Sequence, residues 1–361
     1  MSDNLRRYRA IREALRQYYP DEPTGNVARH LSTLAALISG IVASKSCHLP
    51  HIATKVPDGT KPESRIKRFA RWIGNDTITT EVYFLPYAEV LLGHLALPTL
   101  VLAIDGSVAG RGCVALLISV VYKGRALPVA WLVRRGPKGH FPEDMHIALV
   151  EEVKALIPPH AQVVVLGDGE FDGTDFLDTI ENAGWSYVCR TALSMTASWE
   201  GSAFRLDTIG WCIKAGTLVA LPEVLFTRDN YGPLLLICCW AKGYKEPLYL
   251  VSNLSSAEEA CRLYAKRFRI ETLFSDQKSR GFHLDKSHMS DPQRLSRLLI
   301  ASCLAYIWIV YLGVLCMKDG WMGLIHRRHR CDLSLFQLGL RLLDHLLNEN
   351  LPIPVAFYVL E

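Results

Sequence analysis

The 361-residue chain contains no Cys-x-x-Cys pair, although it has ten cysteines. Without that spacing the cysteines do not predict a zinc module or a redox motif, and several of them lie in apolar runs. The N-terminus is charged and lacks the apolar stretch of a secretory signal. We therefore expect buried free thiols in a reducing cytosol and not a disulfide-bonded secreted protein.

The net charge of the chain is also small, only +4 at pH 7. This value is too small to identify a nucleic-acid-binding protein, so the distribution of the basic residues is more informative. Two N-terminal stretches could form basic helices that dock on phosphates: Arg6, Arg7, Arg9, Arg12 and Arg16 in the first, and Arg65, Lys67, Arg68 and Arg71 in the second. A solvated helix face is the alternative for each.

The segment from residue 264 to residue 278 carries a phenol, a guanidinium, a carboxylate and an ammonium group at a helical spacing. At roughly 100° per residue, Tyr264, Arg267, Glu271 and Lys278 would point within an arc of about 60°. Carboxylates hold hard cations, and Arg and Lys hold phosphate. This face is therefore a candidate site for a metal ion and a polyphosphate backbone. The alternative is a surface ion pair between Arg267 and Glu271.

Two aspartates follow apolar runs that are typical of buried strands. Asp105 follows residues 99–104, and Asp168 follows residues 161–167; a glycine comes next in both cases. Active sites of open α/β sheets lie at the carboxyl ends of strands. Asp105, Asp168 and Glu271 could therefore converge on a pair of divalent ions that stabilise the attacking and leaving oxygens of a phosphodiester displacement. For either aspartate alone, a turn without chemistry is the alternative.

The spacing of the four helical residues, Tyr-x2-Arg-x3-Glu-x6-Lys, resembles the Y-R-E-K motif of DDE transposases from one large group of bacterial insertion sequences. The resemblance covers roughly residues 95–315 and, more weakly, the N-terminal helices. It maps the two family aspartates to Asp105 and Asp168. The chain departs from the pattern after the second aspartate, where many relatives carry Arg and this sequence has Gly169, followed by Glu170 and Phe171.

The resemblance implies a metal-dependent transposase that cuts insertion-sequence ends and transfers them to target DNA, with a hairpin intermediate. Asp105, Asp168 and Glu271 would hold two Mg²⁺ ions, for which Mn²⁺ can substitute. Tyr264 and Lys278 would contact phosphates of the DNA end, assisted by Arg267. The implied partners are double-stranded DNA, as terminal inverted repeats and as target, and a second copy of the chain. The implied location is the bacterial cytoplasm, at the nucleoid and without a membrane.

The order of the expected elements agrees with an α/β, ribonuclease-H-like catalytic domain. Three strands (100–105, 114–121 and 126–133) precede a helix (143–156), a strand (163–166), a helix (172–183) and a fifth strand (186–189). This order places the first and fourth strands side by side. Helices are expected before it, at residues 4–17, 27–45, 62–73 and 80–92.

The length and the 50% hydrophobic share suit two or three domains. We expect a helical DNA-end-binding domain (1–95), a catalytic core in two parts (96–190 and 256–318), an inserted β region (191–255) and a C-terminal helical region (319–361). By the resemblance, the inserted region would position a flipped base of the DNA end. Trp240 could stack that base, with Trp199 and Trp211 as competitors, and a core position is the alternative for each.

Residues 298–317 form an almost uninterrupted apolar run that is long enough to span a bilayer. The run follows the acidic helix, so we expect it to be a core helix that is apolar on all sides. A membrane-associated protein remains the alternative. A C-terminal helix is expected at residues 333–347, after a basic group formed by Arg327, Arg328 and Arg330.

Two other functions remain open beside the transposase. One is a DNA-binding relic that no longer transposes, and the other is a nuclease of the same fold without strand transfer. Clustered carboxylates repel one another without a metal, so three intact acids favour an active enzyme over a relic.

Overall fold

A ten-stranded sheet runs through the centre of the computed structural model, which describes residues 1–361 except 20, 96–98, 138, 140, 328–330 and 360–361. The strand order is β3-β2-β1-β4-β5-β10-β9-β8-β6-β7. The first half contains the predicted core strands β1 (Thr99–Gly110), β2 (Cys113–Tyr122), β3 (Arg125–Arg135), β4 (Gln162–Gly167) and β5 (Ser186–Arg190). Their Val-, Leu- and Ile-rich sequences are buried on both faces of the sheet, which is why these strands read as continuous apolar runs.

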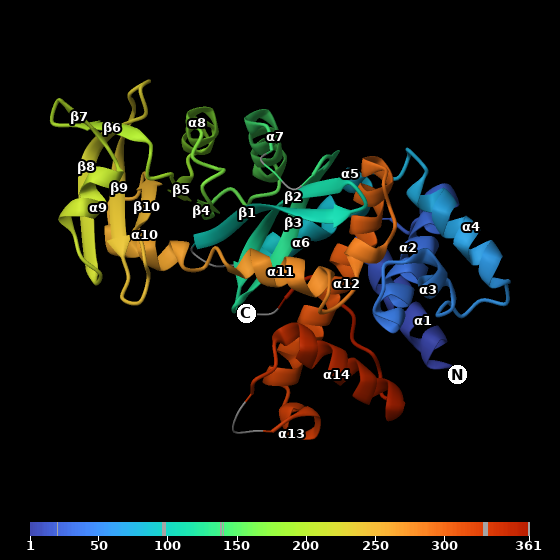
Figure 1. Cartoon of the computed structure of the whole chain (residues 1–361). Helices are drawn as coiled ribbons and strands as arrows, with labels where there is room; N and C mark the ends of the chain where they lie inside the picture. The colour runs from blue at the N-terminus through green and yellow to red at the C-terminus, as the bar shows by residue number, and fades with distance from the viewer. Residues whose placement is uncertain (20, 96–98, 138, 140, 328–330, 360–361) are drawn as a thin grey trace.

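The pairing in this half confirms the ribonuclease-H-like order. β2 lies antiparallel between β1 and β3, whereas β4 lies parallel between β1 and β5. β1 and β4 are therefore neighbours, as predicted. Figure 1 shows α7 (Glu143–Lys154) and α8 (Thr174–Asn182) on one face of the sheet and α11 (Arg269–Gln277) and α12 (Pro292–Lys318) on the other.

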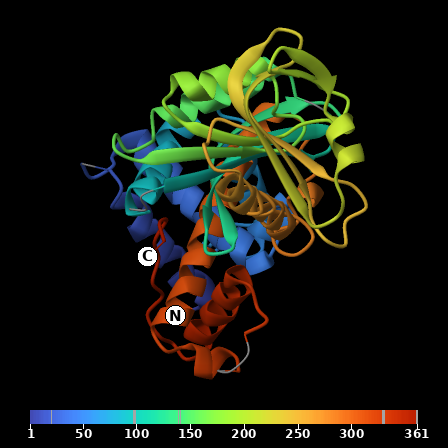
Figure 2. The same ribbon diagram turned by 90° about the vertical axis from the view of Figure 1, so that its left-hand side faces the viewer.

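The inserted strands extend the same sheet. They are β6 (Thr196–Trp199), β7 (Ser202–Arg205), β8 (Thr217–Phe226), β9 (Tyr231–Trp240) and β10 (Leu248–Ser252), with α9 (Asp207–Cys212) between β7 and β8. β10 pairs with β5 of the core, so the hydrogen-bonded ladder continues from one part into the other. The β6–β7 hairpin was not predicted. Figure 2, which looks from this side, shows the inserted strands far from the C-terminal helices.

Among the described residues, six helices precede the sheet: α1 (Asp3–Arg16), α2 (Gly25–Ser44), α3 (Leu49–Ala53), α4 (Pro62–Ile73), α5 (Thr80–Tyr83) and α6 (Leu85–His94). The single helix expected at residues 80–92 is wrong, because the chain breaks at Phe84. Pro86 in the first turn of α6 explains the break, since proline begins a helix but lacks the N–H that would continue one.

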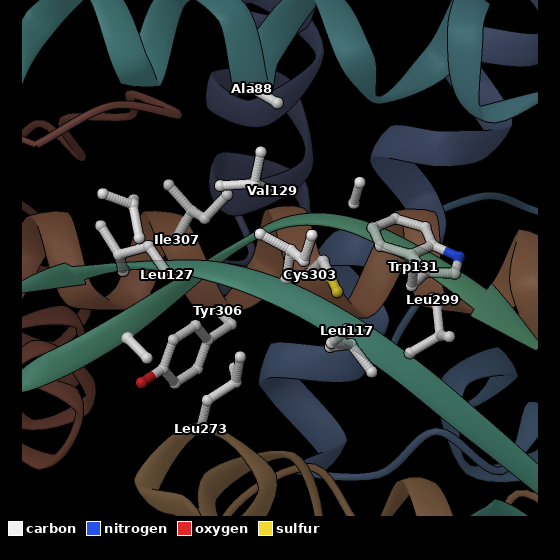
Figure 3. Close-up of a cluster of buried hydrophobic side chains, with 14 of the residues drawn as sticks. Ala88, Leu117, Leu127, Val129, Trp131, Leu273, Leu299, Cys303, Tyr306 and Ile307 are labelled. Carbon is white, nitrogen blue, oxygen red and sulfur yellow. The ribbon is translucent and has the colours of Figure 1, made fainter. Parts of the chain in front are cut away.

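The apolar run lies in α12, where 94% of its most apolar window is buried inside the protein. Within the described residues, α2 and α12 are long and apolar enough to cross a membrane, and burial marks α12 as a core helix. Figure 3 shows Tyr306, Cys303 and Ile307 of α12 among side chains of β2, β3 and α11. α12 also packs against α14 (Leu335–Asn348), which follows α13 (Met322–Ile325). Of the expected basic group, Arg328 and Arg330 lie outside the described residues.

Candidate active site

Asp105 and Asp168 occupy matching positions on neighbouring strands. Their parallel strands pair last at Ala103 and Leu166, and each aspartate lies two residues beyond that pair. The expected strand end at Asp105 is wrong, because β1 continues to Gly110 and pairs Asp105 with Leu117 of β2. β4 ends at Gly167, whereas β1 continues past Asp105 because its antiparallel partner β2 still pairs with it. The two carboxylates therefore lie at the end of the parallel pairing.

The segment from 264 to 278 is two helices and not the continuous helix that was expected. α10 (Ala257–Tyr264) ends before a turn at residues 265–268, and α11 begins at Arg269. Tighter i→i+3 bonds cross the turn, for example from the Arg267 N–H to the Tyr264 carbonyl at 2.9 Å. The two helices bury different cores: Leu263 packs with residues of β5, β9 and β10, while Leu273 packs into the main core. Because the cores differ, a change of direction is needed between the helices.

Arg267 joins two of the three acids. Its guanidinium lies 3.4 Å from Oδ2 of Asp105 and 2.9 Å from Oε1 of Glu271, and it stacks over the Phe268 ring at 4.5 Å. Arg267 is only 6% exposed, whereas the Glu271 side chain is 54% exposed. The buried guanidinium of Arg267 therefore lies between the largely buried carboxylate of Asp105 and the exposed carboxylate of Glu271.

A cavity of about 710 Å³ gathers the acids. Its charged wall consists of Asp105, Asp168, Glu170, Arg267 and Glu271, and its other lining residues include Gly106, Ser107 and Phe141. The structure thus brings Asp105, Asp168, Glu271 and Arg267 together, as the sequence suggested. Within the described part of the chain, no group of three His, Cys, Asp or Glu side chains is already arranged to hold a metal ion.

The electrostatics of the cavity favour an additional positive charge. Burial and, to a lesser extent, the neighbouring Asp168 raise the pKa of Asp105 to about 6, against the lowering effects of Arg267 and the Gly106 N–H. A raised carboxyl pKa means that the ionised form is disfavoured where it lies. A bound cation would remove this penalty, and carboxylate oxygens are the ligands that Mg²⁺ prefers. The donor set therefore fits a hard divalent ion.

Asp168 begins a tight turn that fixes its carboxylate. The Glu170 N–H donates to Oδ1 of Asp168 at 3.1 Å, and the Phe171 N–H donates to the Asp168 carbonyl at 3.0 Å. Gly167 is needed before the turn, because a Cβ there would lie 2.5 Å from Cβ of Phe171. Glu170, Phe141 and Ser107 are among the cavity residues that sequence reasoning did not assign. For Glu170, its place two residues after Asp168 was the available signal.

Tyr264 and Lys278 have different surroundings. Tyr264 is buried at the end of α10, where burial raises the pKa of its phenol to about 12, and it is not among the residues that line the cavity. Lys278 caps α11, and its ammonium donates to Oγ of Ser107, a cavity residue on β1. Lys278 therefore reaches the acid cavity, whereas Tyr264 is buried outside its lining.

The predicted DNA contacts outside the motif do not line the cavity. Trp240 is half-buried and donates from Nε1 to the Tyr244 carbonyl at 2.9 Å, whereas Trp211 is 78% exposed. On α4, Arg65 donates to Asp58 at 2.6 Å and Arg68 pairs with the same carboxylate at 2.9 Å.

Lys67 of α4 is exposed. In the first basic stretch, Arg6 donates to the Leu347 carbonyl at 2.8 Å, and Arg7 is buried against Ser39 at 3.2 Å. Arg6 and Arg7 are therefore engaged inside the protein, while Arg9 and Arg12 remain exposed on α1.

Comparison with known proteins gives a matching family model and similar solved structures. A family model described as "Transposase DDE domain" matches residues 109–308, which include Asp168 and Glu271 and begin four residues after Asp105. No curated protein matches the chain. Among solved structures, the chain is similar to the cryo-electron-microscopy structure of a piggyBac transposase synaptic complex with hairpin DNA. That match has 11% identity and a TM-score of 0.47, and it covers 97% of this chain and 82% of the other.

Proposed function

Because the chain belongs to the transposase DDE domain family, we propose that this DDE transposase excises an insertion sequence and joins its ends to target DNA by cut and paste. The observation that carries the proposal is the shared cavity of Asp105, Asp168 and Glu271, which also contains Arg267. Three acids from two strands and a helix suit phosphodiester chemistry, because they can hold cations where negative charge develops.

Asp105, Asp168 and Glu271 would hold two Mg²⁺ ions, with Mn²⁺ as a substitute. When bound, the ions would supply stabilisation of the attacking and leaving oxygens of the phosphodiester. The protein's own contribution is positional. The sheet places Asp105 and Asp168 at one level, and α11 brings Glu271 to the same cavity. Arg267 supplies a guanidinium group to the same cavity.

The proposed reaction has four phosphoryl transfers. Water attacks the phosphodiester at the transposon end, and the 3′-oxygen leaves as a hydroxyl. That 3′-hydroxyl attacks the opposite strand, which forms a hairpin and releases the flanking DNA. After the hairpin is reopened by water, the same hydroxyl attacks the target. Tyr264 and Lys278, the latter held at Ser107, would contact phosphates of the DNA end, and Arg267 would assist there.

The proposed partners are double-stranded DNA and a second copy of the chain, since two ends must be paired before insertion. The domain at residues 1–95 would recognise the terminal inverted repeats. Within α4, exposed Lys67 would contact phosphate, while Arg65 and Arg68 would shape the surface through Asp58. Trp240 in the inserted region (191–255) would stack a flipped base. We propose that the enzyme acts in the bacterial cytoplasm, at the nucleoid.

The test is cleavage of DNA that carries the inverted repeats flanking this coding region, in Mg²⁺, by the wild type and by Glu271→Gln. We expect nicked or hairpinned ends from the wild type only, and retained DNA binding in the variant. Binding without any cut in either protein would indicate a DNA-binding relic. Cut but unjoined products in the presence of target DNA would indicate a nuclease without strand transfer.

A further inference from the structure

Glu170 makes contacts in three directions at the edge of the acid cavity. Its carboxylate accepts a hydrogen bond from the Phe141 N–H, and Oε1 lies 3.6 Å from Nε2 of His146. Its own N–H donates to Oδ1 of Asp168 at 3.1 Å. Glu170 therefore connects the turn that holds one catalytic candidate to the segment that precedes α7.

Phe141 continues this connection toward the other aspartate. Its ring lies against Gly106 so closely that a Cβ on Gly106 would be 2.3 Å from Cε2 of Phe141. The Gly106 N–H in turn donates to Oδ1 of Asp105 at 2.7 Å. A continuous chain of contacts thus runs from Asp168 through Glu170, Phe141 and Gly106 to Asp105.

The surroundings of this chain are rigid. His146 is 2% exposed and packs against Phe171 at 4.6 Å and Phe176 at 5.7 Å between ring centroids, which limits the movement of Glu170 on that side. The guanidinium of Arg134 covers the Phe141 ring at 5.0 Å. Buried contacts on both sides leave the Glu170 carboxylate and the Phe141 ring few alternative positions.

We propose that Glu170 is a positioning residue that fixes the separation of Asp105 and Asp168 by holding Phe141 against Gly106. This inference rests on the proposed function, because it concerns the geometry of the acids that would bind metal. Residues that orient metal ligands typically affect metal affinity by about 10–100-fold. A competing role is that Glu170 is itself a ligand, since its side chain lines the same cavity. The two roles differ in whether the negative charge is needed.

The full-length protein allows a direct test by calorimetric titration with Mn²⁺. We expect Glu170→Ala to weaken Mn²⁺ binding by about tenfold or more, because the Phe141 N–H loses its acceptor. Glu170→Gln keeps a carbonyl acceptor without the charge, and we expect it to bind within about threefold of the wild type. Equal losses in both variants would overturn the positioning role in favour of a ligand. Unchanged affinity in Glu170→Ala would overturn both.

Glu143 supplies a matched control. Its carboxylate accepts a hydrogen bond from the Phe176 N–H at 2.9 Å, and it is not among the residues that line the cavity. Glu143→Ala removes the same kind of bond, so we expect a lower melting temperature with unchanged Mn²⁺ affinity. If Glu143→Ala lost as much Mn²⁺ affinity as Glu170→Ala, the effect of Glu170 would be a general destabilisation of the fold. That result would overturn the proposal.

A second variant keeps the test available if Glu170→Ala does not fold. Phe141→Ala removes the ring from Gly106 at the other end of the contact chain, and we expect a similar loss of Mn²⁺ affinity. Unchanged affinity in this variant would overturn the proposal. Wild-type protein that neither binds Mn²⁺ nor cuts DNA would overturn the proposed function itself. If the wild type bound Mn²⁺ and cut DNA, and Glu170→Ala did both equally well, only the positioning role of Glu170 would be overturned.

Discussion

The guanidinium of Arg267 lies between Asp105 and Glu271, 3.4 Å from one carboxylate and 2.9 Å from the other. This arrangement balances part of the negative charge of the cavity with a guanidinium group. It also joins β1 to the turn between α10 and α11, so one side chain serves both the electrostatics and the packing of the site.

Replacing Arg267 should therefore destabilise the protein through the carboxylates that remain. We expect Arg267→Met to lower the free energy of unfolding by about 1–3 kcal/mol, because Asp105 is left with an uncompensated charge in a buried position. Chemical denaturation at pH 7.5 without metal measures this. Adding Asp105→Asn should restore part of the loss. Additive losses in the double variant would show that the two groups do not interact.

Glu152 on α7 gives a pH-dependent prediction away from the site. Burial raises its pKa to about 6, and Glu81 adds to the effect. The folded protein then binds more protons than the unfolded chain between the ordinary carboxyl pKa and about 6, so stability falls as pH rises through this window and stays lower above it. We expect Glu152→Gln to stabilise by about 1 kcal/mol at pH 7.5, after allowance for solvent screening, and to be nearly neutral at pH 4.

Melting temperatures of the wild type and Glu152→Gln between pH 4 and pH 8 measure this difference. The neighbouring exposed Glu151 is the control, and Glu151→Gln should change the melting temperature little at any pH. A pH-independent gain in Glu152→Gln would mean that packing, and not charge, makes the variant more stable.

Local sequence patterns were sufficient for most of the core fold. The apolar runs before Asp105 and Asp168 predicted two strands, and the element order predicted that β1 and β4 are neighbours. Local patterns could not predict the end of β1, because β2 continues to pair with it beyond Asp105. They also could not predict the turn at residues 265–268, because an amphipathic pattern does not say that its two halves pack on different cores.

The same reasoning explains what was found and missed at the site. Asp105, Asp168, Glu271 and Arg267 stand out because their residue types and spacing are unusual in apolar surroundings. Phe141 and Gly106 do not stand out in the sequence. They are far apart along the chain, and their contact depends on tertiary packing. The functional roles of all these residues remain predictions that metal binding and cleavage would test.

The contact between α12 and α14 gives a prediction about the core helix. A Cβ on Gly339 would lie 1.8 Å from the Ile309 carbonyl oxygen, so the two backbones are too close for any side chain. We expect Gly339→Ala to destabilise by about 3 kcal/mol or more, because the helices must separate. Gly93→Ala on α6 is the matched control, since a Cβ there meets nothing within 4 Å, and it should be neutral or slightly stabilising. Thermal unfolding of both variants without detergent measures the contrast.

The hydrogen bond from Lys278 to Ser107 gives a prediction about DNA binding at the cavity. The hydroxyl of Ser107 holds the ammonium group beside the acids, although it carries no charge itself. Removing it in Ser107→Ala should leave Lys278 less well placed for phosphate and raise the KM for cleavage of a DNA end by about five- to tenfold, with a smaller change in kcat.

Ser107→Thr retains the hydroxyl and should restore most of this loss. A fall in kcat at unchanged KM would instead mean that Ser107 disturbs its neighbour Asp105. Lys278→Ala should raise KM at least as much as Ser107→Ala, and the double variant should be no worse than Lys278→Ala alone, because the hydroxyl acts through the ammonium group. A double variant with fully additive losses would show that Ser107 contacts DNA by itself.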